Sequence, residues 1–458
     1  MSLLNKLMLV FPEVKGPEAK KLGFNIKLKW TLVVLVAFFL LSVIPLFGLG
    51  ENSLEQFEQL AIILGASFGS ILSLGIGPIV TASIVLQLLM GSGILKIDTT
   101  THEGRVFFQG LQKLSSVFFI IFESLIYVFL GGLAPASELK GTTAYFGMEW
   151  ILVLQLIIGG LIILFMDEIV TKWGFGSGVS LFIAAGVSQE LIIRAFSPLN
   201  SLGAWAFGSG TPPVGAVFVF FMSLIAGIPR EAIIALASIL ATLIVFALSV
   251  YAQSMKVEIP LSFGRIRGFG MRWPLNFLYT SNIPVILVAA LLANIQLWAR
   301  LFGANQTSVV LQLVSTPNLL MNILRGTFTN FDIVHALFYL VVLIIGAVIF
   351  SVFWMQTAGQ DARSVARQIM GSGLQIPGFR RDERIVESVL KRYILPLTVM
   401  GGITIGVLAA TADLLGALSR GTGILLTIMI IYKLYEQIAR DHMYDMYPGL
   451  KKVMGGGH

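Results

Sequence analysis

The sequence has no cysteine and only four histidines among 458 residues. The absence of cysteine excludes disulfides, thiolate metal ligands and thiol catalysis. None of the histidines has a second His, Asp or Glu at a spacing typical of a metal site. They are His102, His335, His442 and His458. We therefore expect no metal.

No Walker motif is present either. The glycine-rich segment 174–178 has no preceding strand and no Lys followed by Ser or Thr, so it does not resemble a phosphate-binding loop. Any energy source must then come from a partner or a gradient. We expect no cofactor and no enzymatic activity.

Charge is scarce: 12% of the residues are charged and 56% are hydrophobic, with a mean hydropathy of +0.87. Such a composition is far from that of a soluble globular domain. Ten apolar runs are long enough, or nearly long enough, to cross a membrane. They are 28–47, 75–95, 114–133, 150–166, 178–193, 232–251, 283–301, 334–355, 393–410 and 421–435. The predicted fold class is an all-α, polytopic membrane protein with ten transmembrane helices and one half-inserted helix.

The distribution of basic residues supports this topology. Alternate connections and both termini hold 25 of the 31 Lys and Arg residues, and the other set holds 6. Because basic loops stay inside, both termini are predicted to be cytoplasmic, in a multi-pass protein of the cell membrane. The net charge of +7 follows from this asymmetry, so it does not call for a DNA partner.

Five spans on each side of a long outer connection predict two inverted halves. The first half is 30–200, the outer hinge loop is 201–231 and the second half is 232–440. The run 214–228 is short for a span, and an eleventh span would destroy the charge asymmetry. We expect a short helix on or in the outer face there.

The remaining segments are predicted to be cytoplasmic. Residues 1–29 are expected to contain a short amphipathic surface helix rather than a cleaved signal peptide. Basic loops cover 255–276 and 357–392, and a tail covers 441–458. The loops serve either as topology determinants in contact with lipid headgroups or as docking sites for a polyanionic partner such as a ribosome.

The stretch 59–95 has 37 residues and no charge, yet glycines and one proline interrupt it. A continuous helix of this length would reach roughly 55 Å, against about 30 Å of hydrocarbon. The chain must therefore enter, stop and start again, with the break at Gly75-Ile76-Gly77-Pro78. Irregular backbone at that depth must be covered by protein or line a polar path. We predict a half-inserted segment followed by a full span.

Acidic residues within or beside the spans are few, although a coupled transporter would need them. They are Glu123, the pair Asp167 and Glu168, Glu190 and Asp413, of which only Glu123 is expected to lie deep. Two interpretations follow from the residues: a secondary transporter of a small solute with a broken-helix site, or a conduit for a large and varied substrate.

Several motifs resemble the SecY family, the central subunit of the protein-conducting translocon. They lie, in the family's order, at 75–82 (GIGPIVTA), 182–189 (FIAAGVSQ), 282–286 (NIPVI), 293–298 (ANIQLW) and 421–426 (GTGILL). The similarity covers nearly the whole chain, and 391–394 (KRYI) is similar to the archaeal branch. The resemblance implies a channel that translocates unfolded secretory polypeptides and releases transmembrane segments sideways into the bilayer.

The resemblance also implies roles for individual residues. A plug at about 54–73 would close the resting channel, with Leu60, Ile63, Gly65, Phe68 and Gly69 among its residues. An aliphatic pore ring would comprise Ile76, Val80, Val179, Ile183, Ile286 and Leu426. A lateral gate would be lined by Thr81, Glu123 and Asn294, and a ribosome would dock at Arg265, Arg267, Arg380 and Arg381.

The partners implied by the resemblance are a SecE-type clamp subunit, a small beta subunit, the ribosome, signal sequences, nascent polypeptides and membrane lipid.

Overall fold

The computed structural model describes residues 12–18, 22–52, 66–91, 93–95, 97, 101–200, 204–207, 211–263, 270–280, 283–301, 309–317, 319–371, 374–375, 382–419 and 421–446. Most of these residues are helical. The α-helices are α2 (Phe24–Val43), α4 (Gly77–Gly91), α5 (His102–Phe129), α6 (Thr143–Trp173), α7 (Gly178–Phe196), α8 (Ala216–Ile225), α9 (Pro229–Ser254), α10 (Ile283–Leu301), α11 (Val309–Val314), α12 (Leu319–Arg325), α13 (Asn330–Thr357), α14 (Ala362–Gly371), α15 (Glu383–Leu414) and α16 (Gly421–Met446). A 3-10 helix, η2, covers Ser137–Leu139. The strands are β1 (Leu49–Asn52), β2 (Leu133–Pro135), β3 (Lys256–Phe263), β4 (Gly270–Asn276) and β5 (Leu374–Gln375).

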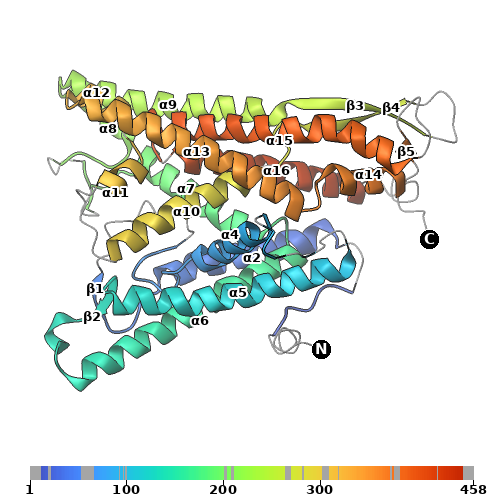
Figure 1. Ribbon diagram of the computed structural model, residues 1–458. Coiled ribbons are helices and arrows are strands. Elements are labelled where there is room, and N and C mark those ends of the chain that lie inside the picture. Colours follow the sequence, from blue (N-terminus) through green and yellow to red (C-terminus); the bar gives the residue numbers. More distant parts are fainter. Residues whose placement is uncertain are drawn as a thin grey trace.

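The long helices run along one common axis (Figure 1). In that view α9, α13, α15 and α16 form one layer, α2, α4, α5 and α6 form another, and α7 and α10 lie between them. The strands β3 to β5 and α14 lie at one end of the bundle, here called the β3 end. The strands β1 and β2, with α8, α11 and α12, lie at the opposite end, here called the β1 end.

The predicted polytopic all-α class is confirmed. Eight described helices have the length and apolar composition of a membrane span. They correspond to eight of the ten predicted runs, and the other two form α4 and α10, whose apolar helical stretches are shorter. Several helices extend beyond the apolar run into polar sequence, where a capping side chain begins them. Thr101 Oγ1 accepts from Gly104 N (3.1 Å) at α5, and Asp382 Oδ1 accepts from Arg384 N (3.0 Å) at α15.

The predicted break before α4 is present. Residues 66–76 form turns, and α4 begins at Gly77. Gly69 and Gly75 have φ of 93° and 55°, a region that favours glycine. Residues 66–73 are thus not helical, contrary to the expected half-inserted helix, whose residues 54–65 lie outside the described residues. The side chains of Ser70 and Ser73 bond this backbone and so compete with helix formation, and the Ser67 hydroxyl donates to Ser42 O of α2 (3.0 Å).

The two short helices expected from the sequence have different outcomes. The run 214–228 does contain a short helix, α8, as predicted. At the N-terminus, residues 1–11, whose apolar side chains suggested the amphipathic helix, lie outside the described residues; residues 12–18 are irregular and the first described helix begins at Phe24. Residues 12–18 instead lie along α6, where Val14 N donates to Glu168 Oε2 (3.0 Å) and Lys172 Nζ pairs with Glu13 (2.5 Å).

The two basic loops form one structured unit, which the sequence interpretation missed. β3 pairs antiparallel with β4 from Lys256↔Asn276 to Ser262↔Gly270, and β5 pairs with the other edge of β3 at Ser262↔Gln375. Alternate side chains of this hairpin pack on α14 and the start of α15, in a cluster that includes Ile259 and Leu275. At the same end Lys256 Nζ lies 3.5 Å from Glu436 of α16.

Glycines allow the closest helix contacts. On α15, a Cβ at Gly406 would lie 2.8 Å from Ile344 Cα and one at Gly402 would lie 3.1 Å from Val348 Cα, both on α13. On α6, a Cβ at Gly159 would lie 2.0 Å from Ile71 O in the irregular segment. Such small faces are typical of helix packing in membranes. Here they also let a helix approach non-helical backbone.

We predict that Gly159→Ala destabilises the protein by about 1–3 kcal/mol, because the new methyl group meets a backbone oxygen that cannot move freely. The measurement is the midpoint of thermal unfolding in detergent. Gly147→Ala on the same helix is the control, since a Cβ there meets nothing within 4 Å. Equal midpoints for the two variants would contradict the prediction.

Candidate functional site

Four elements contribute aliphatic side chains to one point of the bundle. Ile76 directly precedes α4 and Val80 is one turn later, so both lie on one face. α7 repeats this spacing with Val179 and Ile183, and α10 and α16 each contribute one residue, Ile286 and Leu426.

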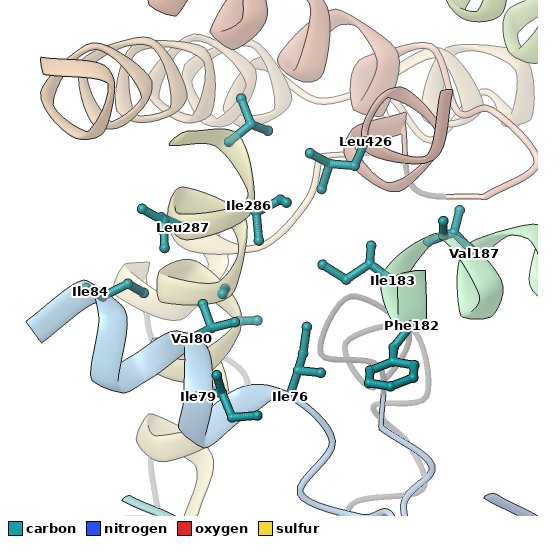
Figure 2. Close-up of a cluster of buried hydrophobic side chains, with 14 of the residues drawn as sticks. Ile76, Ile79, Val80, Ile84, Phe182, Ile183, Val187, Ile286, Leu287 and Leu426 are labelled. Atoms are coloured by element: carbon teal, nitrogen blue, oxygen red, sulfur yellow. The ribbon is translucent and has the colours of Figure 1, made fainter. Parts of the chain in front are cut away.

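These six residues, here called the ring, are brought together by the structure. Figure 2 shows Ile76, Val80, Ile183, Ile286 and Leu426 converging from the four elements. All five are at most 4% exposed and belong to one core cluster, and Val179 packs against that cluster. A constriction lined by such side chains would resist wetting and ion passage.

A carboxylate at the end of α6 fixes the start of α7 and therefore two ring residues. Asp167 Oδ1 accepts from Val179 N (2.9 Å), which satisfies a free donor of the first helical turn. A Cβ at Gly178 would lie 2.6 Å from Asp167 Cα, so glycine permits this approach. The sequence interpretation noted Asp167 only as an acid at a span end. Its capping role could not be read from the sequence, because it depends on how α6 and α7 meet.

Beside the ring, a polar group bridges three helices. Asn294 Nδ2 on α10 donates to Thr81 Oγ1 on α4 (2.8 Å), and Thr81 Oγ1 lies 3.1 Å from Glu123 Oε1 on α5. The three side chains are 4%, 6% and 0% exposed, respectively. The structure thus joins all three residues that were predicted to line one gate. Thr81 follows the ring residue Val80, so ring and polar group are adjacent on α4.

This polar group is not fully satisfied. Glu123 Oε2 and Asn294 Oδ1 are buried and have no hydrogen-bond partner within the described part of the chain. Each such atom costs about 1–3 kcal/mol relative to its hydrated state. A helix contact with unpaired oxygens is therefore easier to open into water than a fully paired one. Alongside it, the rings of Phe122 on α5 and Trp298 on α10 meet edge to face at 6.3 Å.

The other acids lie apart from this group, and two of them are buried in the bundle. Glu190 is 9% exposed and Asp413 is 4% exposed. Asp413 accepts from Tyr339 Oη (2.8 Å) and Thr422 N (3.1 Å), so it fixes the start of α16. These acids form separate local contacts and not a chain. Within the described ranges, no three His, Asp or Glu side chains gather as metal ligands.

The remaining predicted site residues are placed only in part. Leu60, Ile63 and Gly65 lie outside the described residues, as do all four docking arginines, at 265, 267, 380 and 381. Phe68 is described and contacts the Tyr127 ring of α5 at 6.4 Å. Gly69 O accepts from Leu46 N (2.9 Å), so this segment is fixed to the end of α2.

The apolar helices and the aliphatic cluster where they meet define a polytopic helical membrane protein. Comparisons with known proteins agree. The SecY family model matches residues 70–435, and a model described as the plug domain of Sec61p matches 36–69. The protein translocase subunit SecY of Methanothermobacter thermautotrophicus is 45% identical over 98% of each chain, and that of Pyrococcus furiosus is 42% identical over 97% of each.

Solved structures give the same result. A structure described as that of a protein conducting channel has a TM-score of 0.82 and 40% identity, covering 98% of this chain and all of the other. Sec61 in a canine ribosome-channel complex has a TM-score of 0.79 and 39% identity, with the same coverage. The chain belongs to the SecY family. It is a protein-conducting channel, and these matches support this function rather than the transporter alternative.

We predict that Ile183→Ser raises resting ion conductance severalfold, because a hydroxyl hydrates the apolar constriction. The measurement is single-channel recording of the purified protein in planar bilayers. Ile192→Ser is the control, since Ile192 is on the same helix but 59% exposed. Equal conductance in both variants would remove Ile183 from the ring.

Proposed function

We propose that the channel opens as two halves, 30–200 and 232–440, that hinge at 201–231. The observation that carries this proposal is the origin of the ring: Ile76, Val80, Val179 and Ile183 come from the first half, and Ile286 and Leu426 from the second. Separating the halves therefore widens the ring. The connection between α7 and α8 is compact, with Val214 N donating to Leu199 O (2.8 Å) and Gly215 N to Ser197 O (3.0 Å), as suits a pivot.

The lateral gate in this proposal is the seam between α4 and α5 on one side and α10 and α13 on the other. Opening breaks the bond between Asn294 and Thr81, which is worth about 0.6 kcal/mol by comparison with measured bonds between membrane helices. An entering signal helix gains about 0.3–0.6 kcal/mol for each Leu or Ile that reaches lipid. Summed over a dozen apolar residues, this gain exceeds the cost of the broken bond. The segment that the gate admits thus supplies the energy to open it.

We expect Asn294→Leu and Glu123→Leu to make the gate more selective. Each substitution removes one buried oxygen that has no hydrogen-bond partner, which stabilises the closed state by about 1–3 kcal/mol. Each also removes one hydrogen bond, which destabilises the closed state by about 0.6 kcal/mol. The closed seam should gain about 1 kcal/mol, so export of a reporter with a weakly hydrophobic signal falls about fivefold, while a strong signal is still accepted. The measurement is the export ratio of the two reporters. An unchanged ratio in both variants would exclude the gate role.

The plug in this proposal comprises about 54–73. Its described end supports the assignment, because Phe68 contacts Tyr127 and the segment leads directly into the ring residue Ile76. Aliphatic ring side chains can close around any polypeptide without selecting a sequence, and a plug would seal the channel when no polypeptide occupies it.

The proposed surroundings are the cell membrane, with both termini cytoplasmic. The β3 end then faces the cytoplasm and presents both basic loops to a ribosome. A SecE-type clamp subunit and a small beta subunit would complete the complex. Signal sequences and nascent polypeptides are its substrates, and released segments enter the surrounding lipid.

For ribosome docking we predict that Arg380→Glu weakens binding, because a guanidinium that neutralises a phosphate is lost. The slope of the logarithm of the binding constant against the logarithm of the salt concentration should become shallower by about one. The measurement is cosedimentation with ribosomes over a range of salt concentrations. Lys140→Glu, which carries the same charge change between β2 and α6, should bind normally. If Arg380→Glu behaves like this control, the arginine acts in topology alone.

A further inference from the structure

A buried polar contact joins α7 to the connection between α15 and α16. Ser419 Oγ donates to Glu190 Oε2, and the two side chains are 3% and 9% exposed. The other carboxylate oxygen, Glu190 Oε1, lies 2.9 Å from Arg194 Nε one turn later on α7. A hydroxyl bonded to a buried carboxylate makes a stronger contact than a neutral pair does.

The contact lies near two ring residues, because Glu190 is on α7 with Ile183, and Ser419 is two residues before α16, which carries Leu426. Ile183 precedes Glu190 by seven residues on α7, and Ser419 precedes Leu426 by seven residues at α16. On α7 seven residues are about two turns, so the contact lies about 10 Å from Ile183 along that helix. Between them, a Cβ at Gly423 would lie 3.3 Å from Val187 Cγ2, so α7 and α16 stay in contact over this distance.

Ser419 is fixed to the second half from several directions. The preceding Leu418 N donates to Thr242 Oγ1 of α9 (3.0 Å), and the start of α16 is bonded to Asp413 of α15 through Thr422 N (3.1 Å). Glu190 belongs to the first half. The contact between Ser419 and Glu190 therefore crosses the two halves, as the bond between Asn294 and Thr81 does. In Figure 2 the α7 and α16 side of the ring lies opposite the α4 and α10 side.

We propose that Glu190 and Ser419 are a second closing contact of the channel, on the side of the ring away from the lateral gate. A hydrogen bond is lost once its atoms separate by about 1 Å beyond contact. In the proposed opening of two halves, Ile183 of the first half and Leu426 of the second move apart by more than this. Glu190 moves with α7, and Ser419 moves with the segment that leads into α16. Opening the ring between α7 and α16 thus breaks the contact. Because this costs free energy, the contact raises the hydrophobicity that a signal sequence needs to open the channel.

Glu190 also faces a large cavity at the β1 end. This cavity of about 820 Å³ is lined by Glu190, Arg194 and Ser67, among others. Water reaches the carboxylate from this side once the contact opens, so the charged group does not remain stranded in apolar surroundings. The contact is therefore reversible.

The inference rests on the proposed opening of two halves, and a double-mutant cycle tests it in the full-length protein. Ser419→Ala should increase export of the weak-signal reporter about threefold, the effect of one lost bond between membrane helices. In a Glu190→Gln background the same substitution should have a smaller effect, because the two side chains are coupled. Ser419→Thr, which keeps the hydroxyl, should restore selectivity.

The matched control is Ser238→Ala, which should leave export unchanged. Ser238 lines the same cavity and is 8% exposed, and its hydroxyl bonds to Ile234 O of its own helix. The amount of channel in the membrane is measured in parallel. A Ser419→Ala channel that is merely less abundant, with an unchanged ratio of weak to strong signals, would overturn the proposal, as would equal effects of Ser419→Ala in both backgrounds.

The gate variants separate this inference from the proposed function. Asn294→Leu shifts selectivity in the opposite direction from Ser419→Ala. If Asn294→Leu lowers weak-signal export and Ser419→Ala has no effect, the second closing contact is excluded while the gate stands. If neither variant changes selectivity, the opening of two halves is itself wrong and the inference falls with it.

Discussion

The structure depends on one constraint: backbone N–H and C=O groups inside an apolar bundle must be hydrogen-bonded. Helices meet it by themselves, but residues 66–76 do not form one. Their polar groups are bonded to the end of α2, through Ile71 N to Ile44 O (3.0 Å), and to their own serines. Gly159 brings α6 close enough to cover them. The chain can thus place Ile76 at the centre of the bundle and begin α4 there, which a continuous helix would not allow.

From this start the site follows by helical geometry. On α4 the pairing of Ile76 with Val80 gives one face to the ring, and the next residue, Thr81, turns toward α5 and α10. Apolar closure and a polar seam are therefore adjacent but face different partners. The ring offers no polar group to an ion, whereas the polar groups beside it are only partly satisfied, as the proposed gate requires.

Much of this could be predicted from the sequence, because a lipid environment imposes strong rules. Ten apolar runs and the alternation of basic loops indicated the helices, and the predicted bounds 283–301 coincide with those of α10. The break at 75–78 was also recognisable, since glycine and proline act locally. The association of Thr81, Glu123 and Asn294 came from the family resemblance, because hydropathy gives no signal for which polar groups meet.

What the sequence did not reveal depends on contacts between distant segments. The serines that bond residues 66–73 look like ordinary small residues in an apolar run, and only their mutual bonds show why no helix forms there. The capping of α7 by Asp167 needs the geometry of two helices at once. Strands β3 to β5 were missed because prolines and glycines in 255–276 are typical of loops, and because β5 joins from more than a hundred residues away.

That small sheet has a mechanical consequence. Its buried side chains share one core with Val386, Leu390 and Ile394 of α15, so hairpin and helix form one rigid piece that extends from the membrane-spanning part beyond the end of the bundle. α15 in turn is held against α13 through Gly402 and Gly406, with no side chain between the two backbones to absorb a tilt. A large particle bound to the hairpin would therefore transmit a force through α15 directly to the helices that form the wall of the channel.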